Sequence, residues 1–314
     1  MKYIIKKVLI LCLTLFLISL LTFGAFYIVP GDPALLILGV EASEEKLETL
    51  REQLGTNLPL AEQYKNWILG FLQGDFGTSL KYSQPVSKLL EGRLPVTIIM
   101  GCMVMAMVLI AGIWLGVYAA KKKDTWIEQL INAYTMLGIS IPGFFLSIIV
   151  MWIFGLILHF FVPGNYVSYK DNLPEFLRFM FFPAFSLAVP QTAIMVKYIR
   201  AAVLNELQAD YVRTAKGKGN KARGILYGHV LKNAIVAIVP LVGMMIGEIF
   251  SGSIIIEQVY GIPGVGSLLI TAVTSRDFPL AQTLVVYVAL IIVVTNFLVD
   301  IVIQLIDPRI RLSN

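Results

Sequence analysis

The sequence has only two cysteines and two histidines in 314 residues. Cys12 and Cys102 lie in separate apolar runs that fall in opposite leaflets on the topology derived below, so we expect packing residues and not a disulfide. His159 and His229 stand apart from one another, and the chain has no H-E-x-x-H motif and no cysteine cluster. We therefore predict that the chain holds no metal.

The chain also lacks the residue patterns of common catalytic and nucleotide-binding sites. No G-x-x-x-x-G-K-[ST] loop is present, and Gly217 to Gly219 do not replace it because no strand precedes them. Ser140 and His159 could be suggested as a protease pair, but Pro142 stands where a nucleophile turn needs glycine. No catalytic residue is predicted, and we expect the chain not to be an enzyme.

Charge is scarce: 14% of the residues are charged and 57% are hydrophobic. The charged residues collect between continuous apolar runs of about 20 residues, long enough to cross roughly 30 Å of hydrocarbon as a helix. A membrane barrel would instead show alternating segments of about ten residues. These features predict an all-α polytopic membrane protein, whose net charge of +5 reflects cytoplasmic loops and not nucleic-acid binding.

Six transmembrane helices are predicted. The first is too long for a signal-peptide core and no small-residue cleavage site follows it, so we expect it to be uncleaved. The third apolar run has 36 residues, and we prefer one span kinked at Pro142 over two short ones, which would place the most cationic loop outside. The fourth is expected to bend at Pro190, and both termini are then cytoplasmic. The predicted spans are 8–28, 96–120, 127–162, 181–199, 234–256 and 279–306.

The polar segment 31–94 is predicted to form a small extracytoplasmic helical domain. Ser43 is expected to cap a helix that Gly55 ends, Pro59 to open a second helix, and a third short helix near Val86–Leu90 to lead into the next span. Two roles stay open for this segment: stabilising the first two spans, or docking an extracellular component. We therefore divide the chain into 1–95, the first helix with this domain, and 96–314, the main transmembrane domain.

The stretch from 197 to 232 is the most basic part of the chain. Apolar residues from Leu204 to Ala215 follow the spacing of one helix face, and Gly217 and Gly219 then interrupt the pattern. A short amphipathic helix with a flexible basic turn would suit the docking of a cytoplasmic partner. A solvated loop on the inner side would give the same pattern, and spacing alone does not separate the two. The basic residues are Lys197, Arg200, Arg213, Lys216, Lys218, Lys221, Arg223 and Lys232.

Ionisable residues inside spans are costly, which makes Glu248, Glu257 and Asp300 candidates for a pathway or gate. Glu248 and Glu257 are nine positions apart, about 180° around one helix, so they should not share a site. Glu248 either lines a pathway or makes a buried hydrogen bond to a neighbouring helix. Pro263 and Gly264, after the fifth span, are further candidates.

Several stretches resemble a known family. Residues 209–219 read ADYVRTAKGKG and residues 229–234 read HVLKNA, which is similar to the cytoplasmic signature of ATP-binding-cassette (ABC) importer permeases in its peptide-transporter form. Further agreement comes from PGDP at 30–33, GDFG at 74–77, EQVYGIPGVG at 257–266 and DPRIR at 307–311. The broad importer pattern begins Glu-Ala-Ala where this chain has Arg213, Thr214 and Ala215, a departure that peptide-type members share. Over almost its whole length the chain resembles the B-type permease of dipeptide, oligopeptide and nickel importers.

The resemblance implies a type I ABC importer permease fold in a bacterial cytoplasmic membrane. It implies four partners: a second, C-type permease, two cytoplasmic ATPases and an extracytoplasmic substrate-binding protein. ATP and Mg²⁺ would be used by the ATPases, and this chain would bind no cofactor. Within the coupling loop 201–232, the implied ATPase-coupling residues are Ala209, Asp210, Tyr211, Val212, Arg213, Thr214, Ala215, Lys216 and Gly219.

The predicted function is a permease that forms half of the pathway for dipeptides or oligopeptides. A nickel or nickel-chelate permease is the alternative, but nickel favours grouped His, Cys or carboxylate ligands, and the sequence has none. A stand-alone ion-coupled transporter would use Glu248 or Asp300, but the sequence has no convincing internal repeat. A receptor or assembly protein would explain the outer segment and the basic loop, but not the matched stretches.

Overall fold

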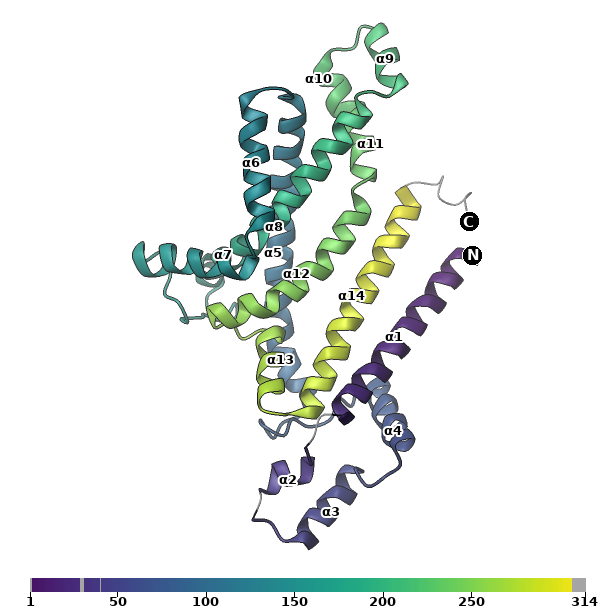
Figure 1. Cartoon of the computed structure of the whole chain (residues 1–314), viewed down its shortest axis with the longest axis vertical. Coiled ribbons are helices and arrows are strands. Elements are labelled where there is room, and N and C mark those ends of the chain that lie inside the picture. The colour runs from purple at the N-terminus through teal and green to yellow at the C-terminus, as the bar shows by residue number, and fades with distance from the viewer. Residues whose placement is uncertain (1, 29–30, 40, 307–314) are drawn as a thin grey trace. The chain divides into compact units, whose positions relative to one another are not determined.

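The computed structural model describes residues 2–28, 31–39 and 41–306 (Figure 1). Within these ranges the regular structure is helical, apart from one isolated β-bridge between Thr78 and Pro85. Five helices in these ranges are long and apolar enough to span a membrane. A sixth span is formed if α6 (Trp126–Ser140) and the bent continuation α7 (Gly143–Val150) with η1 (Met151–Ile157) are counted together. The all-α polytopic fold is therefore confirmed. The five helices are α1 (Lys2–Ile28), α5 (Val86–Lys121), α8 (Leu173–Glu206), α12 (Val239–Tyr260) and α14 (Phe278–Ile306).

The chain divides into two compact units, which are described separately. Unit 1 comprises Met1–Val96 and Gly264–Val294, and unit 2 comprises Thr97–Pro263 and Thr295–Asn314. The division falls inside α5 and inside α14, so each of these helices contributes to both units. The predicted domains, 1–95 and 96–314, stay a prediction.

In unit 1, three short helices follow α1: α2 (Pro33–Leu38), α3 (Glu44–Leu54) and α4 (Leu60–Gln73). Ser43 and Gly55 flank α3 as predicted, Gly55 with the left-handed φ of +69° that favours glycine, although the Ser43 side chain makes no capping hydrogen bond. Pro59 directly precedes α4. The sequence did not predict α2, which begins where the Asp32 carboxylate accepts the Ala34 N–H at 2.9 Å.

The Asp32 side chain also holds α2 to α3. Arg51 of α3 donates to Asp32 Oδ2 through Nε at 2.9 Å and is also paired with Glu44 and Glu48. Burial alone would raise the pKa of Asp32, but the hydrogen bonds from Arg51 and the Ala34 N–H outweigh it and hold that pKa below its usual value. Pro30 of the same motif lies outside the described residues.

The predicted short helix at Val86–Leu90 is not separate: it is the first part of α5, which continues through Pro95. Proline removes one backbone N–H, but in an apolar helix the neighbouring structure can compensate, so Pro95 does not end the helix.

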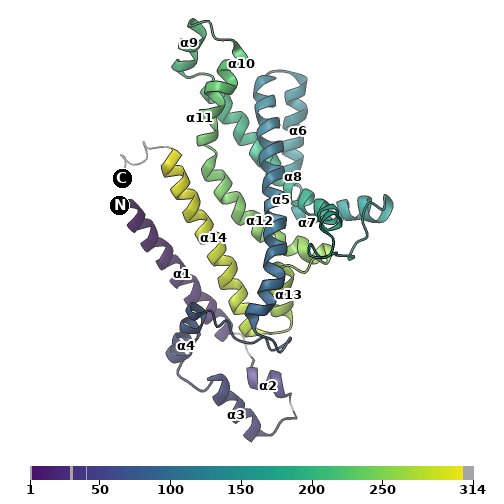
Figure 2. The same cartoon turned by 180° about the vertical axis from the view of Figure 1, so that it is seen from behind.

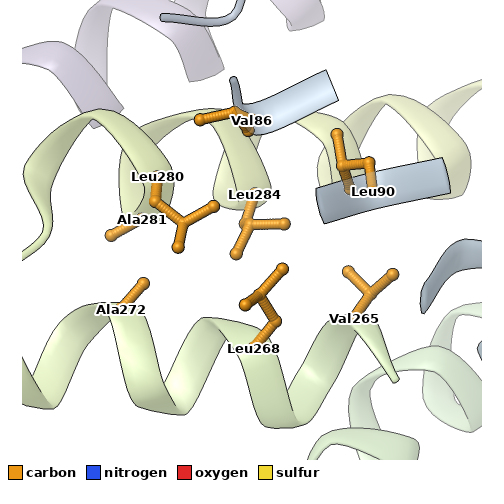
Figure 3. Close-up of a cluster of buried hydrophobic side chains, with 8 residues drawn as sticks. All are labelled: Val86, Leu90, Val265, Leu268, Ala272, Leu280, Ala281 and Leu284. Atoms are coloured by element: carbon orange, nitrogen blue, oxygen red, sulfur yellow. The ribbon is translucent and has the colours of Figure 1, made fainter. Parts of the chain in front are cut away.

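The core of unit 1 joins α5, α14 and a helix that the sequence did not predict, α13 (Val265–Thr274) (Figure 3). Leu280 and Leu284 of α14 point toward Leu268 and Ala272 of α13. The GDFG stretch is fixed beside α14, because Thr283 Oγ1 donates to the Phe76 carbonyl at 3.1 Å.

Asp277, directly before α14, is only 1% exposed and accepts hydrogen bonds from Ser79 Oγ and the Lys81 N–H. The hydroxyl of that serine in turn accepts the N–H of Tyr82 at 3.1 Å. These polar contacts give the connection between α4 and α5 a fixed place in unit 1.

In unit 2, α6 and α7 meet at Ile141 and Pro142 with a bend of 102°. Figure 2 shows α7 turned away from the axis of α6. The break lies where the sequence placed the kink, and no angle was predicted for it. Both α7 and α6 pack against α8, and α7 also contacts α12. This packing, and not the proline alone, determines the direction of α7.

The remaining boundaries of unit 2 differ modestly from those predicted. The fourth span is part of the longer α8, which contains Pro183 and Pro190. The predicted fifth span is interrupted at Ala237 and Ile238, so that α12 begins five residues later than expected. Four short helices connect α8 with α12: α9 (Asp210–Gly217), α10 (Ala222–Ile225), η2 (Leu226–Val230) and α11 (Leu231–Val236).

Two glycines let α5 and α8 approach closely. A Cβ built on Gly116 would lie 2.6 Å from Ile199 Cβ and 3.0 Å from the Val196 carbonyl oxygen. Gly112, one turn earlier, would similarly meet Met195. Since a backbone oxygen cannot move without moving the helix, α5 and α8 would have to separate to accept a side chain at 116.

We predict that Gly116→Ala lowers the stability of the protein by about 1–3 kcal/mol, because the added methyl group overpacks this contact. Gly92→Ala is the matched control: it lies on the same helix and no atom would lie within 4 Å of its Cβ. The measurement is the thermal unfolding midpoint of both purified variants in one detergent. A midpoint for Gly116→Ala equal to that of Gly92→Ala would contradict the packing described here.

Candidate functional site

The basic loop contains the predicted short helix, here α9. It begins after Ala209, with Asp210 in its first turn and Lys216 in its last, an order that suits the helix dipole. The turn that follows is closed by the N–H of Gly219, which donates to the Lys216 carbonyl at 3.0 Å. Figure 1 shows α9 beyond the ends of α8 and α11.

Tyr211 and Val212, two of the residues implied to couple to an ATPase, contact their own chain. Val212 is 1% exposed, and α9 packs against α10. The Tyr211 hydroxyl donates to Glu206 Oε2, at the end of α8, at 2.6 Å. Burial, and then the Glu206 contact, raise the pKa of Tyr211. These two side chains thus help to fasten α9 to its own chain, and their part in coupling to an ATPase stays a prediction.

The exposed face of α9 is polar and carries two basic residues and one acidic residue. Its exposed residues are Asp210, Arg213, Thr214, Lys216 and Gly217. Arg213 lies 3.8 Å from Asp210, but both side chains are more than four-fifths exposed, so the ion pair adds little to stability. Ala209 and Ala215 are half-buried. A partner that approached α9 would thus meet cations first.

Arg200 is the one member of the basic group with a strong internal partner among the described residues. Its Nε donates to Glu128 Oε1 of α6 at 2.7 Å, and Glu128 is 6% exposed. The other Glu128 oxygen accepts the Asp124 N–H at 2.6 Å. Arg200 therefore holds the turn between α5 and α6, while Lys216, Lys218, Lys221, Arg223 and Lys232 are exposed.

Gly219 has a backbone requirement that Gly217 does not share. Its φ is +78°, in the left-handed region, although no atom would lie within 4 Å of a Cβ at either position. A side chain at 219 would be strained by the backbone and not by crowding.

Glu248 lies on an exposed stripe of α12. Residues 244, 248, 251 and 255 are all exposed, at the spacing of one helix face. Gln191 of α8 donates from Nε2 to Glu248 Oε2 at 3.0 Å. Gln191 was not predicted from the sequence, because one amide in an apolar helix carries no motif.

Glu257 occupies the opposite side of α12. It is 0% exposed and accepts a hydrogen bond from Thr97 Oγ1 of α5 at 2.6 Å. The prediction that Glu248 and Glu257 do not share a site is confirmed. In this structure the Glu257 carboxyl is part of helix packing, and its assignment to a pathway stays a prediction.

The other pathway candidates are dispersed. Asp300 is half-buried on α14, Pro263 is half-buried, and Gly264 is buried at the start of α13. Tyr260, between Glu257 and Pro263, is 1% exposed and donates to the Ser147 carbonyl of α7 at 3.1 Å. The stretch 257–266 therefore contributes to helix packing. The DPRIR stretch at 307–311 lies outside the described residues.

Among the described residues, no three His, Cys, Asp or Glu side chains lie close enough to hold a metal ion. His159 hydrogen-bonds only locally, with the Ile157 carbonyl 3.0 Å from Nδ1. The described part of the chain therefore offers two features for function: the basic helix α9, and the Gln191–Glu248 pair on α8 and α12.

Comparisons with known proteins agree with this arrangement. Residues 112–312 match the family of binding-protein-dependent transport system inner membrane components, and residues 1–101 match the N-terminal part of such membrane components. A protein of Brucella abortus, provisionally named as a peptide transport system permease, is 35% identical over 308 residues, 98% of each chain. The oligopeptide transport system permease AppB of Bacillus subtilis is 33% identical over 98% of this chain and 99% of its own. The glutathione transport system permease GsiC of Escherichia coli is 32% identical over 99% of each.

The matches cover nearly the whole chain, and the membrane-spanning helices agree with the location that the family description gives. The chain is thus a multi-pass protein of the cytoplasmic membrane, and it belongs to the family of binding-protein-dependent transport system inner membrane components.

Proposed function

We propose that this chain is the permease subunit of an ABC importer for peptides, forming half of its pathway and receiving the motion of partner ATPases through α9. The observation that carries this proposal is the attachment of α9: its basic face is exposed, while Tyr211 and Val212 bind it to the chain. The relatives named for oligopeptide and glutathione transport support the substrate class.

Peptides are preferred over nickel on chemical grounds. Nickel sites are built from imidazole, thiolate or grouped carboxylates. The described residues bring no such group together, and Glu248 and Glu257 lie on opposite sides of α12. In importers of this kind a separate binding protein delivers the substrate, so the pathway needs to accept peptides more than to select them.

The partners in this proposal are a second permease, two ATPases and an extracytoplasmic binding protein. The ATPases would bind ATP and Mg²⁺ and perform the hydrolysis, and this chain would perform no covalent chemistry. The exposed cations of α9 would steer the docking of an ATPase, because surface charges mainly affect encounter and orientation.

The internal contacts of α9 suggest how motion is transmitted. Tyr211 is hydrogen-bonded to Glu206, the last residue of α8. A displacement of α9 therefore moves the end of α8. Because α8 packs against α6, α7 and α12, the displacement is passed to the helices that carry the pathway candidates.

The orientation proposed here places both termini and α9 in the cytoplasm, and the loop 158–172 outside. We expect Lys170→Cys to react with an impermeant maleimide in intact cells, and Lys218→Cys to react only after permeabilisation. Both lysines are exposed, and the native Cys12 and Cys102 are first replaced by alanine because they are exposed too. The opposite labelling pattern would contradict the orientation.

The docking face is tested by reversing charge on α9. Arg213→Glu and Lys216→Glu should each reduce co-purification of the ATPases and ATP-dependent peptide uptake several-fold, because exposed cations would no longer meet an acidic surface. Lys170→Glu, at an exposed lysine in another loop, is the control and should change neither. Wild-type uptake by both α9 variants, in proteoliposomes that contain the binding protein, would rule out this face.

Transmission is tested separately with Tyr211→Phe, which keeps the ring but removes the hydrogen bond to Glu206. We expect the ATPases to remain bound while the number of peptides imported per ATP hydrolysed falls. Tyr198→Phe, on the exposed side of α8, is the matched control. An unchanged ratio of uptake to hydrolysis in Tyr211→Phe would show that this hydrogen bond does not couple the two processes.

A further inference from the structure

Unit 2 contains a groove between the α6–α7 break, α8 and α12. It lies beside the break at Ile141 and Pro142, next to Pro190 of α8 and Gly252 of α12, and has a volume of about 290 Å³. Its walls are apolar except at two adjacent side chains, Gln191 and Glu248. A carboxylate at membrane depth is costly and is retained mainly where it serves a function.

The pair presents more acceptors than donors. Gln191 is 7% exposed, and its Nε2 is used by Glu248. Its Oε1 is buried and has no hydrogen-bond partner among the described residues. That oxygen is inaccessible from the groove in this structure, so what the pair offers a ligand is the Glu248 carboxylate, which the Gln191 amide holds in place.

The geometry points to a ligand with a primary ammonium group, and we propose that Glu248, held in place by Gln191, binds the ammonium end of the transported peptide. An ammonium carries three N–H donors and a positive charge, so it can pair with the carboxylate through a charge-assisted hydrogen bond. No cationic side chain lines the groove to occupy this place. This inference rests on the proposed function.

The size of the groove limits what enters it. A volume of about 290 Å³ lies at the lower end of ligand pockets, which hold drug-sized molecules. The groove would therefore take one end residue of a peptide, with the rest of the peptide outside it. The apolar walls would accept many side chains and read only the charged group, which suits a pathway that must pass varied sequences.

The direct test is zero-length coupling with dicyclohexylcarbodiimide. The reagent activates a carboxyl group, a bound amine then displaces it to form an amide, and the reagent leaves as the urea. The probe is the peptide Ala-Ala-Lys with an amidated C-terminus, which offers both an α-amine and a lysine side-chain amine. The complete transporter complex in detergent is treated, digested and analysed by mass spectrometry.

We expect a peptide amide at Glu248 in at least about tenfold excess over the one at Glu175, an exposed carboxylate that measures random coupling. Fragmentation of the adduct shows whether the α-amine or the lysine amine reacted. Gln191→Leu should lower the Glu248 adduct without changing the Glu175 adduct. An N-acylurea at Glu248 without peptide would mean a protonated, unoccupied carboxyl and would overturn the proposal, as would equal adducts at the two glutamates.

Transport in proteoliposomes separates this inference from the proposed function. Glu248→Gln should lower peptide uptake about tenfold while ATPase co-purification stays unchanged, because a charge-assisted hydrogen bond is lost. Wild-type uptake by Glu248→Gln would overturn the ammonium site and leave the peptide importer intact. If the unmodified complex imported no peptide but still gave the selective amine adduct, the peptide function would fall and the ammonium site would stand.

Discussion

The constraint on which this structure depends is that backbone groups within hydrocarbon must be hydrogen-bonded inside the protein. A continuous helix such as α12 meets it without help. A break meets it only if its exposed N–H and C=O groups find partners nearby. At the α6–α7 junction the N–H of Ile141 still donates to Leu137, and the Pro142 carbonyl accepts from Leu146, so a bend of 102° leaves these groups paired. The groove beside this junction is thus a by-product of an allowed break.

Hydropathy predicted where the chain crosses the membrane, because the length of an apolar run is a local property. It could not predict the angle at Pro142: proline removes a donor, but the direction of α7 depends on its packing against α8 and α12. It also missed α13, an apolar helix whose ten residues are too few to span a bilayer. The separate short helix predicted at Val86–Leu90 was wrong because α5 continues through Pro95.

The features of the candidate site that depend on residues within one helix or loop could be predicted from the sequence. The separation of Glu248 and Glu257 follows from the helical repeat alone, and the basic residues with two glycines marked the loop around α9. The burial of Val212 was not predictable, because periodicity shows that a helix has an apolar face but not whether that face meets its own chain or a partner. Gln191 lies 57 residues from Glu248, and only the packing of α8 against α12 gives the amide a role.

The two features are connected through a single helix. Glu206, which receives the Tyr211 hydrogen bond, and Gln191, at the groove, both belong to α8, about 22 Å apart at the rise of an α-helix. A helix is stiff along such a length, so a displacement of α9 reaches Gln191 with little loss. Pro190 directly precedes Gln191, and proline is where a helix bends most easily. Motion that enters at Glu206 would therefore be converted into a change of angle at the groove, where the amide and the carboxylate meet.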